Sequence, residues 1–318
     1  MKALFFNGSN LELTERPTPD IRSGESLVRV LVAGICRTDI EIMKGYMNFA
    51  GILGHEFVGE IVKSDDSSMI GKRVVGEINA GCGKCDFCRK GLERHCADRT
   101  TLGIAGRDGA FAEYLTLPTS NLVEVPDSVS NEKAVFVEPL AAAVEILEQI
   151  HLAPASRVLI IGDGRLSALT FLVLRLTGSE LTVLSKHHEK KKFFDSMGAR
   201  VMSVEETQNK KREFDFVVEA SGSPSGWITA TELVKPRGTI VLKSTYHGKA
   251  QFDSSILVIN EISVVGSRCG QFKPALRILN MGLADPSSLI SGSFTLDNYR
   301  RAFEQADSKE AFKTLITM

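Results

Sequence analysis

The chain has 318 residues, and this length favours two domains that each bury a core of their own. Hydrophobic residues make up 43% of the chain and charged residues 24%, with 27 Gly against 10 Pro, which is the composition of a folded α/β protein and excludes a disordered or fibrous one. The formal net charge of −1 gives no broad basic surface, so we expect neither a nucleic-acid nor a membrane partner. A small neutral or mildly polar molecule is then the expected partner.

The N-terminal residues 1–13 contain no pattern typical of a secretory signal. Their short apolar stretch is interrupted by Asn7, Gly8 and Asn10, and no small-residue cleavage site follows. Further along, the apolar run Leu169–Leu174 ends at Arg175 and is too short to cross a bilayer. These features predict a soluble, cytoplasmic protein.

The first part of the chain is rich in short β-like runs separated by Gly and polar turns, which predicts a strand-rich domain. The expected strands are Ser26–Ala33, Glu56–Val62, Lys72–Glu77 and Ala110–Leu117. After Glu138 the pattern changes, because Pro139 suits the first turn of a helix that we expect through Ala141–Ile150.

From Arg157 onward apolar strands alternate with helices, which predicts a parallel sheet with helices on its faces. The expected strands are Val158–Ile161, Leu181–Leu184, Phe214–Glu219, Thr239–Lys243 and Ser263–Gly266, and the expected helices are Leu166–Leu176 and Glu189–Met197. The remaining segment, Phe272–Met318, is expected to form a helix, a strand near Ser293–Leu296 and a helix over Asn298–Asp307, and to fold back onto the first domain.

Four of the six cysteines lie close together in the sequence, and without a secretion signal such clustering indicates metal ligands and not disulfides. The four are Cys82, Cys85, Cys88 and Cys96. Thiolates at this spacing can surround one Zn²⁺ as a closed tetrahedral site, which leaves no position for substrate and predicts a structural zinc. An iron–sulfur cluster is the rival ligand, although nothing else in the sequence indicates electron transfer, and four unrelated buried thiols are the other alternative.

A second metal site is indicated by a thiolate, an imidazole and a carboxylate. Cys36 and His55 each lie at the end of a predicted strand, and Glu138 interrupts an apolar run. Three protein ligands leave the fourth position that a catalytic zinc requires. Each residue alone has a simpler interpretation: a lone Cys is usually a core residue, a lone His a satisfied polar group, and Glu138 a first-turn acid of a helix.

A strand–turn–helix pattern at Arg157–Ser167 predicts a nucleotide site. Gly162 permits the tight turn, and Gly164 lets the backbone approach a pyrophosphate at the N-terminus of the helix that begins with Arg165 and Leu166. Ser167 replaces the third glycine of the usual motif, which weakens the match but is small enough for close packing.

The second strand of this unit ends at Leu184, where an NAD-binding protein would place an acid for the adenosine ribose. Here Ser185, Lys186 and His187 follow instead, and a hydroxyl with cationic groups suits a 2′-phosphate. The sequence therefore predicts NADP(H) in preference to NAD(H); the alternative is a solvated basic start of a helix. Residues expected at the nicotinamide end are Ala220, Ser221, Gly222, Ser267 and Arg268.

Taken together, these motifs resemble the zinc-containing medium-chain dehydrogenase/reductase family, which includes alcohol, sorbitol, threonine and glucose dehydrogenases. The resemblance rests on Gly34–Asp39, Gly54–Glu56, the four-cysteine loop, Glu138–Leu140 and the βαβ unit that follows. It implies an α/β protein with a strand-rich GroES-like catalytic domain at residues 1–139, completed by residues 270–318, and a Rossmann domain with a doubly wound parallel sheet at residues 140–269.

The family resemblance also implies roles for individual residues. Cys36 and His55 would be catalytic zinc ligands, with Glu56 or Glu138 as the remaining protein ligand. Thr38 would take the proton of the alcohol, and Arg37 would contact the cofactor pyrophosphate. Glu41 stands where many alcohol dehydrogenases have a histidine at the end of the proton relay, so the relay beyond Thr38 stays open.

The implied function is a cytoplasmic oxidoreductase that transfers a hydride between NADP(H) and an alcohol, polyol or sugar. It would bind two zinc ions per chain and assemble as a homodimer or homotetramer. Two alternatives remain: a zinc-independent quinone or enoyl reductase of the same fold, and a zinc-ribbon nucleic-acid binder, which would leave the glycine motif unexplained. Candidate walls of the substrate pocket are Tyr46, Phe49 and Trp227.

Overall fold

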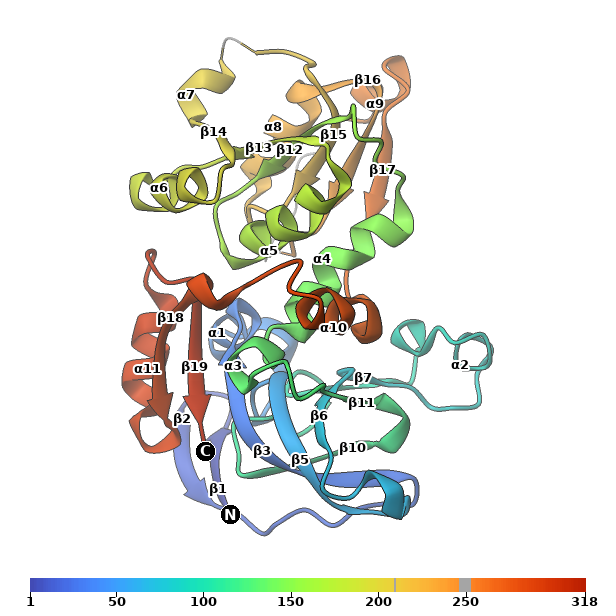
Figure 1. Ribbon diagram of the computed structural model, residues 1–318, viewed down its shortest axis with the longest axis vertical. Helices are drawn as coiled ribbons and strands as arrows, with labels where there is room; N and C mark the ends of the chain where they lie inside the picture. Colours follow the sequence, from blue (N-terminus) through green and yellow to red (C-terminus); the bar gives the residue numbers. More distant parts are fainter. Residues whose placement is uncertain (209, 246–252) are drawn as a thin grey trace. The chain divides into compact units, whose positions relative to one another are not determined.

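The structure, a computed structural model, describes residues 1–208, 210–245 and 253–318. Its contacts divide the chain into two compact units: unit 1 comprises Met1–Glu138 and Gln271–Met318, and unit 2 comprises Pro139–Gly270. Unit 1 is rich in short strands, whereas unit 2 contains a parallel sheet with helices (Figure 1). The α/β fold class predicted from the sequence is thereby confirmed.

The main sheet of unit 1 is built around one long, almost fully buried strand, β3 (Glu25–Ile35). In the described residues the order of strands is β11-β6-β5-β3-β19-β18, and β10 also pairs with β3. The other strands are β5 (Glu56–Ser64), β6 (Arg73–Gly76), β10 (Tyr114–Pro118), β11 (Leu122–Glu124), β18 (Ile290–Thr295) and β19 (Lys313–Thr317). At its C-terminal end β3 lies between β5 and β19, and both strands run antiparallel to it.

Two small sheets and several short helices complete unit 1. The sheets have the orders β2-β1-β4 and β7-β8-β9. Their strands are β1 (Lys2–Phe6), β2 (Leu11–Glu15), β4 (Gly51–Ile52), β7 (Asn79–Ala80), β8 (Thr100–Leu102) and β9 (Gly106–Arg107). The helices are α1 (Arg37–Met43), α2 (Asp86–Arg89), α3 (Asn131–Ala134), α10 (Phe272–Asn280) and α11 (Tyr299–Asp307), and α4 (Val137–Gln149) begins here.

The C-terminal segment is part of the main sheet of unit 1. Strand β19 lies beside β3 with Thr314 opposite Ile35, and its side chains Leu315 and Ile316 are buried. The sequence predicted that this segment folds back onto the first domain but did not predict β19. A strand of five residues between a polar turn and the chain end carries too little periodicity to be recognised.

In its described residues, unit 2 contains a six-stranded parallel sheet with the order β14-β13-β12-β15-β16-β17, which is the Rossmann arrangement. Its strands are β12 (Arg157–Ile161), β13 (Glu180–Leu184), β14 (Arg200–Met202), β15 (Phe214–Glu219), β16 (Val234–Leu242) and β17 (Ser263–Gly266). Its helices are the rest of α4 and α5 (Arg165–Leu174), α6 (His188–Ser196), α7 (Val204–Thr207), α8 (Pro224–Leu233) and α9 (Ser254–Ile259).

Three differences from the sequence analysis have physical causes. The strand expected at Ala110–Leu117 begins only at Tyr114, because Phe111 and Ala112 contact β1 through single backbone pairings instead of a ladder. Helix α5 ends at Leu174 and continues as a short 3-10 turn. Trp227 is 6% exposed in the apolar core of unit 2, so its interpretation as a pocket wall is wrong.

Across the described ranges, every helix is too short or too polar to cross a membrane.

Candidate metal and nucleotide sites

Two antiparallel strands bring the first set of metal-ligating side chains together. Cys36 follows the last residue of β3, while His55 and Glu56 lie at the start of β5. Because Gly34 pairs with Glu56, the end of one strand lies beside the start of the other. The sulfur of Cys36, a ring nitrogen of His55 and a carboxylate oxygen of Glu56 all lie within 4.8 Å of one another.

Asp39 connects the two loops of this cluster, and the sequence analysis assigned it no role. Its Oδ2 accepts a hydrogen bond from the backbone N–H of Cys36 (2.8 Å), which caps helix α1. Its Oδ1 accepts one from the Gly54 N–H (3.2 Å) and lies 3.3 Å from His55 Nδ1. With Nδ1 directed at this fully buried carboxylate, Nε2 is the ring nitrogen that can bind a metal.

The buried imidazole of His55 lies among negative groups. Burial lowers its pKa, but the Asp39 carboxylate and the Cys36 sulfur outweigh burial and raise the pKa well above the usual value. A cation at this position is thus favoured, and a metal ion would replace the proton.

Glu56 forms a buried ion pair that the sequence analysis also missed. Its Oε2 accepts a short hydrogen bond from Lys313 Nζ, and the two side chains are 1% and 0% exposed. Its other oxygen, Oε1, is buried without a hydrogen-bond partner in the described residues. An orphaned carboxylate oxygen beside a thiol and an imidazole offers three ligand types that zinc accepts, one of them without another partner.

Glu138 is near this cluster but is not among its three closest donors. Burial raises its pKa to about 7; His55 lowers the pKa, and Glu56 and Glu77 raise it further. Thr38 also contacts the cluster, since its Oγ1 accepts a hydrogen bond from Cys36 Sγ (3.6 Å). The hydroxyl therefore lies beside the Cys36 sulfur, and its role toward an alcohol stays a prediction.

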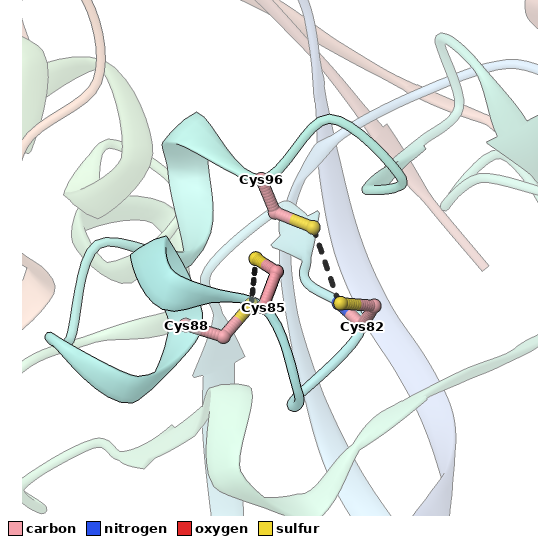
Figure 2. A group of neighbouring side chains, drawn as sticks. All are labelled: Cys82, Cys85, Cys88 and Cys96. Atoms are coloured by element: carbon pink, nitrogen blue, oxygen red, sulfur yellow. Dashed lines mark hydrogen bonds between the residues drawn. The ribbon is translucent and has the colours of Figure 1, made fainter.

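The four remaining clustered cysteines form a second group of donors. Their sulfurs lie within 4.8 Å of one another, and their side chains point into a common space (Figure 2). Cys85 precedes helix α2 and lies 3.5 Å, sulfur to sulfur, from Cys88, while the Cys82 N–H donates to Cys96 Sγ (3.4 Å). Gly81 is required here, because a Cβ would lie 2.7 Å from Cys88 Sγ.

The thiols of this loop have unequal acidities. Hydrogen bonds from the backbone N–H groups of Lys84 and Cys85 lower the pKa of Cys82 to about 7, whereas burial raises the pKa of Cys88 to about 12. Four crowded thiols in this state suit a divalent cation that deprotonates all of them.

In unit 2 the glycine loop connects β12 to α5. Gly162 has φ 116°, and a Cβ there would lie 2.7 Å from the Ala220 carbonyl oxygen, so only glycine fits. A Cβ at Gly164, which precedes α5, would meet no atom within 4 Å. The loop therefore leaves an open approach to the N-terminus of a ten-residue helix, which fits a pyrophosphate.

The residues proposed for a 2′-phosphate are already hydrogen-bonded to a carboxylate. Asp163 Oδ2 accepts from Ser185 Oγ (2.9 Å), from the backbone N–H groups of Lys186 (2.8 Å) and His187 (3.0 Å), and contacts His187 Nδ1 (2.9 Å). The missing acid noted after β13 is thus matched by an acid from the glycine loop. The sequence analysis missed Asp163 because the middle position of the glycine motif carries no residue preference.

The segments expected at the nicotinamide end follow β15 and β17. Ser221 Oγ donates to Glu219 Oε1 (2.5 Å) after β15, and the Gly222 N–H donates to Ser244 Oγ (2.8 Å). After β17, Ser267 and Arg268 are held by Lys243, whose Nζ donates to Ser267 Oγ (3.1 Å) and to the Arg268 carbonyl (2.8 Å).

Two residues of α1 are engaged with other charges of unit 1. Arg37 contacts Asp307 Oδ1 (2.6 Å) on α11 and Glu41 Oε1 (2.9 Å) on its own helix. Glu41 also lies 3.7 Å from Lys44 Nζ. These ion pairs occupy the groups that were considered for the pyrophosphate and for the end of the proton relay.

Two family models match the chain and together span most of it. The alcohol dehydrogenase GroES-like domain matches residues 22–127, and the glucose dehydrogenase C-terminus matches residues 122–318. The chain belongs to the zinc-containing medium-chain dehydrogenase/reductase family.

The sequences of known relatives align with this chain over nearly their whole length. A sorbitol dehydrogenase of Halalkalibacterium halodurans is 28% identical, covering 95% of this chain and 94% of the relative, and an L-threonine 3-dehydrogenase of Shewanella halifaxensis is 27% identical, covering 96% and 95%. Among solved structures, an alcohol dehydrogenase of E. coli CFT073 complexed with NADH has a TM-score of 0.93 at 26% identity, covering 100% of this chain and 99% of that one.

A second structural relative is a zinc-binding dehydrogenase of Sinorhizobium meliloti bound to NADP, with a TM-score of 0.90 at 25% identity, covering 100% and 99%. The family and these relatives make the chain an oxidoreductase that acts on CH–OH groups with a nicotinamide cofactor. The zinc-independent reductase and the nucleic-acid binder considered from the sequence are not favoured.

Proposed function

We propose that this dehydrogenase binds two zinc ions, a catalytic one at Cys36, His55 and Glu56 or Glu138 and a structural one at the four-cysteine loop. One observation carries the proposal: three chemically different donors converge within 4.8 Å, and one carboxylate oxygen of the set is buried without a partner. In this proposal residues 1–139 with 270–318 form the catalytic domain and residues 140–269 the nucleotide-binding domain.

When bound, zinc would supply a Lewis acid that lowers the pKa of an alcohol, and a nicotinamide would supply the acceptor for the hydride. The chain's own residues would bind the zinc and orient its ligands. Asp39 fixes the ring of His55, and Lys313 holds the Glu56 carboxylate in place. In this proposal the Thr38 hydroxyl, which contacts Cys36 Sγ, receives the alcohol proton.

The proposed substrates are polyols, sugars and secondary alcohols. Support comes from curated relatives of comparable length, which include a D-arabinitol dehydrogenase of Uromyces fabae and a D-xylulose reductase of Aspergillus oryzae, both 26% identical. The net charge of −1 suits uncharged substrates. We further propose a cytoplasmic homodimer or homotetramer.

NADP(H) is the proposed preferred cofactor, with NAD(H) second. The preference now depends mainly on the exposed Lys186, because Ser185 and His187 donate to Asp163. Arg165 and Leu166 at the start of α5 complete the proposed pyrophosphate site, with Gly162 and Gly164.

The test of the zinc proposal is a Cys36→Ser variant, compared with Cys269→Ser as a control outside both cysteine clusters. Metal analysis should find two zinc ions per chain in the wild type and in the control, and one in Cys36→Ser. Oxidation of a panel of polyols, followed by NADPH absorbance, should fall by at least about a hundredfold in Cys36→Ser only.

A Cys36→Ser protein that keeps both zinc ions and full turnover would show that the cluster at Cys36 is not the catalytic centre.

A further inference from the structure

The glycine loop of unit 2 carries a carboxylate whose role nothing in the family motif explains. Asp163 lies between Gly162 and Gly164 and is 9% exposed. All four of its hydrogen bonds come from the loop after β13, donated by Ser185, Lys186 and His187. That loop is where an NAD-binding protein places an acid for the ribose hydroxyls.

The two oxygens of Asp163 have different environments. Oδ2 takes all four bonds, and within residues 1–208, 210–245 and 253–318 no hydrogen bond to Oδ1 is found. The side chain is 11% exposed and lies just beyond the carboxyl ends of β12 and β13. Ligands of such sheets bind outside these ends. Oδ1 therefore carries none of these bonds, at the edge of the sheet where the adenosine ribose would lie.

The carboxylate is charged at neutral pH. Burial alone raises the pKa of Asp163, but hydrogen bonds from His187 and Ser185 outweigh burial and hold the pKa below its usual range. Two cationic side chains lie nearby. The ammonium of Lys190 is attracted by the Asp163 carboxylate and repelled by the guanidinium of Arg165. The glycine loop thus holds the negative charge of Asp163 close to cationic side chains.

We propose that Asp163 supplies, from the glycine loop, the acid that the end of β13 lacks, and that its Oδ1 accepts a hydrogen bond from the adenosine ribose of NAD(H). The inference rests on the proposed nicotinamide-linked function. The same negative charge repels a 2′-phosphate, whereas Lys186 attracts it. Asp163 is therefore a specificity-determining residue that limits the preference for NADP(H).

The experiment is an Asp163→Asn variant of the full chain. The amide keeps the shape and one oxygen for the loop donors, but it replaces the charged acceptor with a neutral N–H group. Calorimetric titration gives Kd for NAD⁺ and NADP⁺, and for 5′-AMP and 2′,5′-ADP, which differ only in the 2′-phosphate. We expect the ratio Kd(NAD⁺)/Kd(NADP⁺) to rise about tenfold in the variant, with the same direction for the two adenosine fragments.

Two further variants separate charge from loop position. Glu180→Gln removes an exposed carboxylate at the opposite end of β13, where it pairs with Arg200, and it should leave the ratio unchanged. Asp163→Ser also removes the charge and should raise the ratio, which provides the test if Asp163→Asn does not fold.

Unchanged ratios in the Asp163 variants, or an equal shift in Glu180→Gln, would overturn the role of Asp163. A wild-type chain that binds neither dinucleotide would instead contradict the proposed function.

Discussion

Lys313 and Glu56 illustrate how single residues determine the metal site. Their charged groups meet although they are 257 positions apart in the sequence, because β19 and β5 lie on either side of β3. Gly34 on β3 leaves the necessary room, since a Cβ there would lie 2.5 Å from Glu56 Oε2. The buried ammonium thus compensates the charge of a carboxylate that also faces Cys36 and His55.

We expect Lys313→Met to destabilise unit 1 strongly. The change keeps an apolar stem near Phe136 but leaves the Glu56 carboxylate buried and unpaired, which costs about 3–5 kcal/mol in the free energy of unfolding. Urea denaturation of the zinc-free protein measures this loss, and Glu56→Gln in the same chain should restore most of it.

Lys2→Met is the matched control for this substitution. It breaks an exposed ion pair with Asp297 (2.8 Å), which solvent screens, so the free energy of unfolding should stay close to that of the wild type. If both lysine variants lost the same free energy of unfolding, the buried Glu56 carboxylate would not depend on the Lys313 ammonium.

The ends of strands and helices position the candidate metal and nucleotide sites. The glycine loop at the end of β12 allows a prediction that compares two glycines. Gly162→Ala should lower the free energy of unfolding of unit 2 by about 1 kcal/mol or more, because the residue has φ 116° and its methyl group would meet the Ala220 carbonyl. Gly164→Ala should unfold like the wild type, since no protein atom lies within 4 Å of the added methyl group.

The same pair of variants tests the nucleotide site. The methyl group of Gly164→Ala would occupy the open approach to α5, so its Kd for NADP⁺ should rise while its stability stays constant. A Gly164→Ala protein that binds NADP⁺ as tightly as the wild type would show that the dinucleotide does not approach this turn.

The sequence predicted the elements that carry strong local signals and missed those that depend on distant partners. The strands Phe214–Glu219 and Ser263–Gly266 were predicted with their observed bounds, because apolar runs bounded by polar turns are visible locally. The clustering of Cys82 to Cys96 was equally local. Lys313 and Asp163 were missed, because their roles arise from side chains brought together only by the folded sheets.

Trp227 shows the opposite error. A large aromatic residue after a glycine-rich turn can line a pocket or fill a core, and only the packing of α8 against the sheet decides between them. The structure places it with Leu159 and Phe214 in the core. Burial at this position is a tertiary property that the local pattern does not contain.

At the scale of the whole molecule, the two units have separate sheets and separate candidate ligand sites. Both cysteine-containing clusters belong to unit 1, and the glycine loop belongs to unit 2. Zinc bound as proposed would therefore contribute folding free energy to unit 1. A dinucleotide bound to unit 2 would raise its free energy of unfolding by about 2.7 kcal/mol at a concentration of a hundred times Kd.

This division predicts two separable thermal transitions. Trp227, the single tryptophan of the chain, lies in the core of unit 2, so its fluorescence follows that unit, whereas calorimetry follows both. A zinc chelator should lower the calorimetric transition that fluorescence does not report, because the crowded thiols and the buried carboxylates lose their cation. NADP⁺ should raise only the fluorescence transition. If the chelator shifted the tryptophan signal as far as the calorimetric one, the two units would unfold together and zinc would stabilise both.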